Sequence, residues 1–162
     1  MFMNDDSKAM PPTAEPWPPL SFWEGVAQFN RGDFYACHDT LEAIWMVAPT
    51  PEKSFYQGIL QLAVGLYHLG NHNWRGAAIL LGEGSRRLEA YEPDFQGIHV
   101  SDLLDRAELW LQTLQSLGPD RVAEVAIALL SPPDSPASAT AGAMATGLDM
   151  PQPHIYLLPD HP

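Results

Sequence analysis

The stretch FYQGILQLAVGLYHL, residues 55–69, decides the fold class of this chain. Projected as a helix, its apolar side chains surround the axis instead of forming one stripe, which is typical of a helix at the centre of a bundle. They are Phe55, Ile59, Leu60, Leu62, Ala63, Leu66 and Leu69. The apolar part is interrupted by Gln61 and His68 and is too short to span a bilayer. The stretch therefore predicts the central helix of a soluble helical domain.

Turn and capping residues on either side of this stretch indicate further helices. We expect helices over about residues 21–30, 34–47, 50–69, 74–91, 101–116 and 120–130. The first is expected to open with a capping box formed by Ser21 and Glu24, the second with Asp33 as N-cap, and the third with Thr50 as cap. No segment alternates with the period of two that a half-buried strand needs. The sequence predicts an all-α bundle of five or six helices.

Two turns in this helical region resemble each other. FNRGDFYA, residues 29–36, and HLGNHNWRGA, residues 68–77, each combine a glycine turn, an Asn or Asp, an aromatic residue that starts the next helix, and then a small residue. Their spacing differs by insertions. The pattern resembles a tetratricopeptide-like helical hairpin, and it predicts two such hairpins closed by a C-terminal cap. Gly58 and Gly65 are expected to let the central helix approach its neighbours closely.

The ends of the chain differ in composition from its middle. Residues 1–19 are expected to be a disordered leader, residues 20–130 the helical domain, and residues 131–162 a flexible tail rich in Pro, Ala and Ser. The apolar run Ile155–Leu158 either docks onto the domain or a partner, or belongs to a free tail; we favour the free tail.

Charge and cysteine content restrict the function. The chain has 20 acidic and 8 basic residues, a net charge of -12, and no basic cluster, so nucleic-acid binding is not expected. Its single cysteine, Cys37, excludes an internal disulfide and a cysteine-based zinc site, and is expected to be a core residue. The N-terminus lacks the pattern of a secretion signal and no apolar stretch suits a membrane, so we expect a cytoplasmic protein.

Polar side chains on the second and third predicted helices form the candidate site. On the second helix, His38 lies within an apolar stripe, Glu42 lies at its border, and Trp45 belongs to the same stripe. On the third, Gln57, Gln61 and His68 share one strip. Because unpaired polar groups are costly to bury, we expect His38 and Glu42 to face this strip. Charged residues of the fourth helix are expected only to face solvent: Glu83, Arg86, Arg87, Glu89 and Glu92.

The same residues carry a family resemblance. The chain resembles the domain of unknown function 309 family over about residues 22–110, in the run FNRGDFYACHDTLEAIW of residues 29–45, in FYQGILQLA of residues 55–63, and in Gly76-Ala77 with Gly97. The resemblance implies a small bacterial or archaeal all-helical fold without an established activity. In the family pattern a Glu follows the histidine, where this chain has Asp39.

Three interpretations of the cluster remain open. In the first, His38, Glu42, Gln57, Gln61 and His68 form a buried hydrogen-bond network that fixes helix packing. In the second, His38, Glu42 and His68 bind Zn or Fe and serve a metal-dependent enzyme.

In the third, a groove that includes His38, Glu42 and Gln61 binds a small molecule or a protein partner. Aromatic side chains would line this groove: Tyr35, Trp45, Tyr56, Tyr67 and Trp74. We favour a non-enzymatic binding or scaffold module without a cofactor, which could also form a homo-oligomer, with His38, Glu42, Trp45, Gln57, Gln61 and His68 as binding residues.

Overall fold

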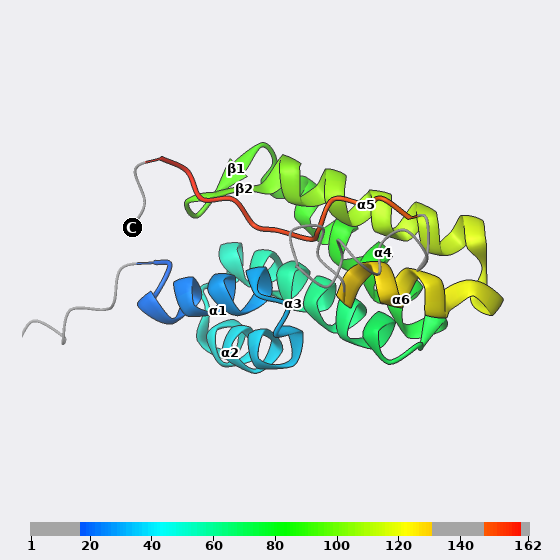
Figure 1. The fold of residues 1–162 in the computed structure, drawn as a ribbon. Helices are drawn as coiled ribbons and strands as arrows, with labels where there is room; N and C mark the ends of the chain where they lie inside the picture. The colour runs from blue at the N-terminus through cyan, green and yellow to red at the C-terminus, as the bar shows by residue number, and fades with distance from the viewer. Residues whose placement is uncertain (1–16, 131–147, 160–162) are drawn as a thin grey trace, which may run out of the picture.

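The computed structural model describes residues 17–130 and 148–159, and over these residues the protein is mostly helical (Figure 1). The α-helices are α1 (Leu20–Asn30), α2 (Phe34–Val47), α3 (Thr50–Gly70), α4 (Trp74–Leu88), α5 (Val100–Leu117) and α6 (Val122–Leu130). Two 3-10 turns, η1 (Glu89–Tyr91) and η2 (Pro119–Arg121), extend α4 and precede α6. The predicted all-α fold is confirmed, apart from one small hairpin of two strands.

The helices pack as two hairpins with α3 between them. The pair α1 and α2 forms the first hairpin and α3 and α4 the second, and α3 contacts both α2 and α4 (Figure 1). Helix α5 covers α4, and α6 packs against α3. Ten residues of α3 are buried, which confirms that it is the central helix. No helix in the described part of the chain is long and apolar enough to cross a membrane.

The turns within the two hairpins have the same geometry. Gly32 and His72 both have positive φ angles, 82° and 61°. The side chain of Asp33 accepts a hydrogen bond from the Ala36 amide, and that of Asn73 accepts one from the Gly76 amide. Each residue of the second turn lies 40 positions after its counterpart. The two turns therefore match without insertions, and the expected difference in spacing is wrong.

The two hairpins also share close helix contacts. A Cβ atom added at Gly25 of α1 would lie 3.3 Å from the side chain of Leu41 in α2, and one at Gly65 of α3 would lie 3.1 Å from that of Leu81 in α4. The closest approach joins α3 and α4, where a Cβ at Gly84 would lie 2.7 Å from the carbonyl oxygen of Gly58. The predicted role of the glycines in α3 is confirmed.

Two predicted helix caps are wrong. Helix α1 begins at Leu20 because the extended Pro19 supplies a carbonyl that accepts a hydrogen bond from the Phe22 amide at 2.9 Å. Ser21 therefore lies inside the first turn and forms no capping box with Glu24. Likewise, α3 starts at Thr50 after Pro49, and no side chain caps it. A proline just before each helix takes the N-cap position, two residues before the predicted cap Ser21 in α1 and one residue before the predicted cap Thr50 in α3.

The C-terminal residues 148–159 pack against the domain, although we expected them to belong to a flexible tail. These residues, shown in orange to red in Figure 1, run along α5 towards the hairpin of β1 (Asp94–Phe95) and β2 (Ile98–His99). Ile155 is only 1% exposed. Buried apolar side chains and backbone pairing with β2 hold the segment. The rest of the predicted leader and tail, residues 1–16, 131–147 and 160–162, lies outside the described residues.

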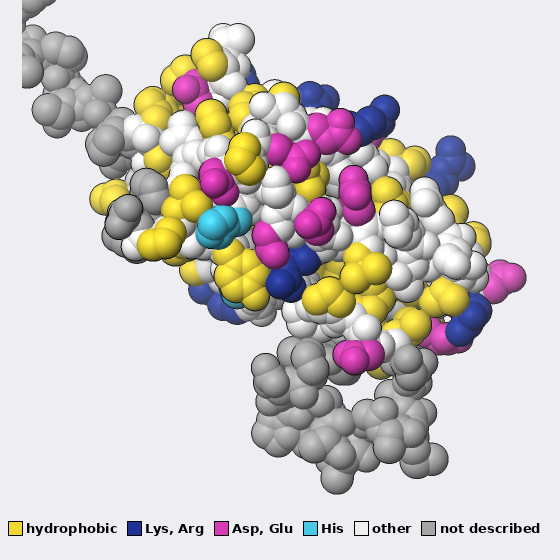
Figure 2. Space-filling model, turned by 90° about the horizontal axis from the view of Figure 1, so that it is seen from above, with side chains coloured by type: hydrophobic (Ala, Val, Ile, Leu, Met, Phe, Trp, Pro, Cys, Tyr) yellow, Lys and Arg dark blue, Asp and Glu magenta, His cyan; other side chains and the backbone are white. Residues whose placement is uncertain are grey.

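The surface reflects the acidic composition. In the space-filling view, acidic side chains gather in the middle of the face over α5 (Figure 2). Asp105 and Glu108, both in α5, are exposed. Elsewhere in the molecule α2 packs against α3, and there four of the candidate residues come together.

Candidate functional site

Four candidate residues line one open groove. Glu42 and Trp45 come from α2, and Gln57 and Gln61 come from α3. The other lining side chains are apolar: Leu60, Val64 and Leu80. The groove encloses about 280 Å³. The adjacency of α2 and α3 therefore brings these four side chains together, as the sequence led us to expect.

Gln61 is paired differently from the expectation. Its side chain is 8% exposed and donates to the Glu83 carboxylate at 3.2 Å, while its carbonyl oxygen accepts from Arg87 Nε at 3.0 Å. Both partners belong to α4, so the expected pairing of Gln61 with His38 and Glu42 is wrong. Because both ends of the amide are engaged, Gln61 is held in one orientation.

The sequence interpretation missed Glu83 and Arg87 as members of the site. They were expected only to face solvent. The signal that could have found them is Gln61 itself, since a buried amide requires a donor and an acceptor from a neighbouring helix. The Gln57 side chain, by contrast, has no hydrogen-bond partner among residues 17–130 and 148–159, so this half-buried amide remains available in the groove.

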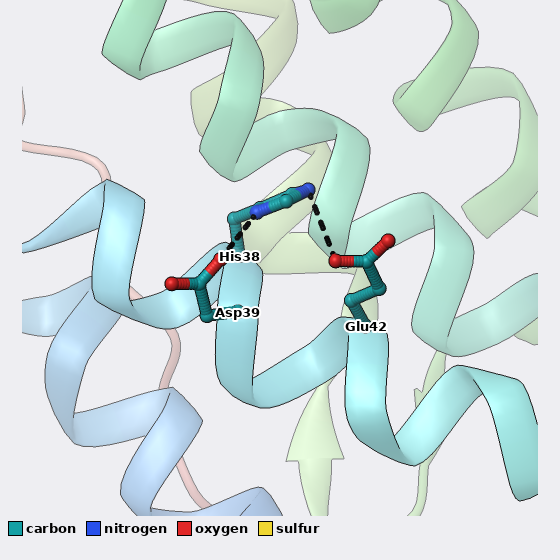
Figure 3. Close-up of side chains that lie close together, drawn as sticks. All are labelled: His38, Asp39 and Glu42. Carbon is teal, nitrogen blue, oxygen red and sulfur yellow. Dashed lines mark hydrogen bonds and ion pairs between the residues drawn. The ribbon is translucent and has the colours of Figure 1, made fainter.

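His38 lies between two carboxylates of its own helix (Figure 3). Its Nδ1 atom is 3.1 Å from Asp39 Oδ1, and its Nε2 atom is 4.0 Å from Glu42 Oε2. The His38 side chain is 27% exposed, and both acids are more exposed. One ligand atom from each of the three residues lies within 4.8 Å of the others, close enough for the three to contact one metal ion.

His68 lies elsewhere. Its Nδ1 atom is 3.3 Å from the Asn73 side-chain amide, and its ring lies so close to Gly76 that an added Cβ there would be 3.0 Å away. It thus lies at the turn between α3 and α4. In the described part of the chain, His68 is not in the group that His38 forms with Asp39 and Glu42. The structure does not bring together the predicted metal set of His38, Glu42 and His68.

The five aromatic residues expected to line the groove lie in different parts of the structure. Trp45 lines it, whereas Tyr56 is fully buried and the indole of Trp74 donates to the Leu114 carbonyl in α5 at 2.8 Å. Tyr35 and Tyr67 pair with each other, with ring centroids 5.4 Å apart, and both are exposed. Only Trp45, of these five, lines the groove.

One negative and one positive side chain lie at the groove. Glu42 is its one charged lining residue, and the Lys53 ammonium lies 5.7 Å from the centroid of the Trp45 ring. Cationic groups are attracted to the negative face of an indole ring. The groove therefore combines a carboxylate, apolar side chains and an indole ring over which the Lys53 ammonium lies.

Comparisons with known proteins agree with the expected resemblance. The model of the family described as domain of unknown function (DUF309) matches residues 22–80. An uncharacterized protein, YpuF, of Bacillus subtilis (strain 168) is 39% identical over 102 residues, which cover 61% of this chain and 55% of that protein. An uncharacterized protein of Aquifex aeolicus (strain VF5) is 26% identical over 81 residues, covering 49% of this chain and 24% of the relative.

The chain spans about half the length of the Bacillus relative and about a quarter of the Aquifex relative. No solved structure gives a significant match. The matched residues 22–80 include α2 and α3 with all six predicted binding residues. Residues 22–80 of this chain therefore match the DUF309 family of domains of unknown function, in agreement with the resemblance seen in the sequence.

Proposed function

We propose that this protein is a non-enzymatic binding module that holds a small amphipathic cation, or such a side chain of a protein partner, in the groove between α2, α3 and α4. The observation that carries the proposal is the lining of that groove: one carboxylate, one indole ring and two amides among apolar side chains. Ligand sites commonly combine an apolar lining with a few converging polar groups.

Each lining group has a distinct part in this proposal. Trp45 offers a ring face for the cationic group, which replaces the Lys53 ammonium that lies over this ring in the free protein. Glu42 supplies the counter-charge, and Gln57 supplies a donor and an acceptor. The apolar side chains contact the body of the ligand. Gln61, fixed by Glu83 and Arg87, supports the floor of the groove.

Nuclear magnetic resonance with a matched pair of probes tests this proposal. Phenylbutylamine carries an ammonium on an apolar body, and phenylbutanol is its uncharged counterpart. At about 0.3 kcal/mol for each of roughly ten non-hydrogen atoms, the amine should bind with a Kd in the millimolar range. We expect saturable shifts of the Trp45 indole and Gln57 amide signals. The alcohol should bind about three- to tenfold more weakly, because cation–π and ion-pair terms are each worth up to about 1 kcal/mol.

A matched pair of variants serves as the control. Glu42→Gln should remove the ion-pair part of the preference for the amine over the alcohol, while Glu24→Gln, an exposed acid on α1, should leave both affinities unchanged. Equal affinities for amine and alcohol in the unaltered protein, or no saturable shift at all, would contradict the proposal.

A second candidate function is a Zn- or Fe-dependent enzyme, and the close approach of His38, Asp39 and Glu42 favours it. In this proposal His38 Nε2 and Glu42 coordinate the ion, while Asp39 accepts a hydrogen bond from Nδ1 and orients the ring. A metal held by so few side chains keeps open positions, which substrate or water could take.

Calorimetric titration with zinc chloride separates the possible ligand sets. If His38 and Glu42 coordinate the ion while Asp39 orients the His38 ring, His38→Gln should abolish binding and His68→Gln should leave it unchanged. If the set of His38, Glu42 and His68 forms, both variants should lose binding. Absence of a binding isotherm in the unaltered protein would remove this candidate.

A further inference from the structure

The C-terminal residues 148–158, here called the strap, bind to the domain in the manner of a peptide ligand. The strap adds to the edge of β2: the His99 amide donates to the Tyr156 carbonyl at 2.9 Å, and the Leu158 amide donates to the Gly97 carbonyl at 2.8 Å. Leu157 pairs antiparallel with Ile98. Such strand addition is a common way to recognise an extended segment, because the backbone supplies the hydrogen bonds.

Side chains of α1 and α5 also contact the backbone of the strap. The Asn30 amide makes two hydrogen bonds to Ile155, accepting from its N–H at 2.7 Å and donating to its carbonyl at 3.0 Å. Trp110 Nε1 donates to the Pro151 carbonyl and Arg106 Nη1 to the Gln152 carbonyl, each at 2.9 Å. These contacts select an extended chain and not a particular sequence.

Apolar side chains of the strap provide selectivity. Ile155 is 1% exposed and Met150 is 8% exposed. Pro153 lines a small cavity together with Phe29 of α1 and Trp110 of α5. Pro151 and Pro153 lack an N–H and favour an extended backbone, so they suit a segment that is bound mainly through its carbonyl groups.

We propose that this groove between α1, β2, α5 and α6 is a recognition site for an extended, proline-containing peptide with an aliphatic residue at the position of Ile155. The strap occupies the site within its own chain, and a second segment of the same chemistry replaces it. The strap is joined to α6 through residues 131–147. A tethered ligand of this kind competes at an effective concentration in the millimolar range, which makes the site accessible only to a peptide that outcompetes the strap.

Hydrogen exchange in the unaltered full chain tests whether the strap leaves its groove. We expect the Ile155 and Leu158 amides to exchange at least tenfold faster than the buried amides of α3, because the strap opens without unfolding of the bundle. Exchange of these amides at the rate of the α3 core would show that the strap leaves only on global unfolding, and this would overturn the proposal.

Fluorescence anisotropy with a labelled peptide tests recognition directly. The probe is LDMPQPHIYLLP, residues 148–159, titrated with full-length protein. Ile155→Ala in the protein weakens the tethered competitor, so this variant should bind the probe at least tenfold more tightly than the unaltered chain does. Gln152→Ala, which removes a hydrogen bond from the strap to the Ala128 carbonyl, should act in the same direction with a smaller effect.

The controls distinguish the groove from non-specific adhesion. Asn30→Ala combined with Ile155→Ala should lose the gained affinity, whereas Gln112→Ala, an exposed change on α5, should retain it. A probe with Asp in place of the isoleucine should not bind. If neither strap variant binds the probe more tightly than the unaltered protein, or if Asn30→Ala has no effect, the groove is not a recognition site.

Discussion

At the scale of single residues, burial decides which groups are chemically available. Cys37 is fully buried in α2, and its burial, with a smaller effect of the Asp33 carboxylate, raises the pKa of the thiol to about 12. Since the thiolate is the nucleophilic form, Cys37 is inert at neutral pH. It is a small core side chain, as the sequence predicted.

An aromatic disulfide reagent measures this directly. At pH 8 we expect the native protein to react at least a hundredfold more slowly than free cysteine, because the thiol is both buried and protonated. In guanidinium chloride the full equivalent of one thiol should react. A native reaction as fast as that of free cysteine would show that Cys37 is exposed.

His154 of the strap makes its docking sensitive to pH. Burial, and then the nearby Arg106 guanidinium, lower the pKa of His154, and Asp102 opposes this in part. The unfolded chain therefore takes up the proton first as the pH falls. The contribution of neutral His154 to the stability of the docked strap is fully present above about pH 6.5, the pKa of histidine in the unfolded chain. This contribution decreases as the pH falls from there towards the lowered pKa of the folded state.

Urea unfolding at pH 7.5 and pH 5.5 tests this for the unaltered protein and for His154→Gln. We expect the free energy of unfolding to fall more between these pH values in the unaltered protein than in the variant. The difference between the two proteins isolates His154 from the other histidines. An equal pH dependence in both would show that His154 does not contribute.

At the scale of secondary-structure elements, the contact between α3 and α4 sets the position of the groove. Gly58 and Gly84 allow the two backbones to approach, which places Gln61 within reach of Glu83 and Arg87. Gly82, which precedes Gly84 by two residues in α4, has space for a methyl group, because an added Cβ would lie 3.8 Å from the Leu111 side chain. These two glycines of one helix form a matched pair.

Gly84→Ala should lower the free energy of unfolding by about 1–3 kcal/mol, because the added methyl group forces the helices apart. Gly82→Ala should be neutral or stabilise the protein by up to about 1 kcal/mol through helix propensity. Urea unfolding curves followed by circular dichroism give both values. Equal effects of the two substitutions would contradict the close contact between α3 and α4.

The elements themselves could be predicted largely from local sequence. Apolar periodicity gave the helices, and the N-caps Asp33 and Asn73 follow from their residue types. The starts of α1 and α3 were misplaced because Pro19 and Pro49 determine them through backbone conformation and not through a side-chain cap. The strands β1 and β2 are too short to show alternation.

At the scale of the whole molecule, long-range contacts decide what local patterns cannot. Periodicity placed Glu42, Trp45, Gln57 and Gln61 on facing sides of adjacent helices, and the structure finds them in one groove. It could not assign the partners of Gln61, which lie on α4, nor the contact of Ile155 with Asn30, 125 residues away. His68 shared a helical strip with Gln61, but it lies about two turns along α3 and so reaches a different neighbour.

Intermolecular nuclear Overhauser effects from bound phenylbutylamine test most directly whether the groove between α2, α3 and α4 is the binding site. We predict contacts from its phenyl protons to the methyl groups of Leu60, Val64 and Leu80, and from the methylene group next to its nitrogen to the Trp45 indole. Contacts confined to other surfaces of the protein, with none to these four side chains, would contradict the account.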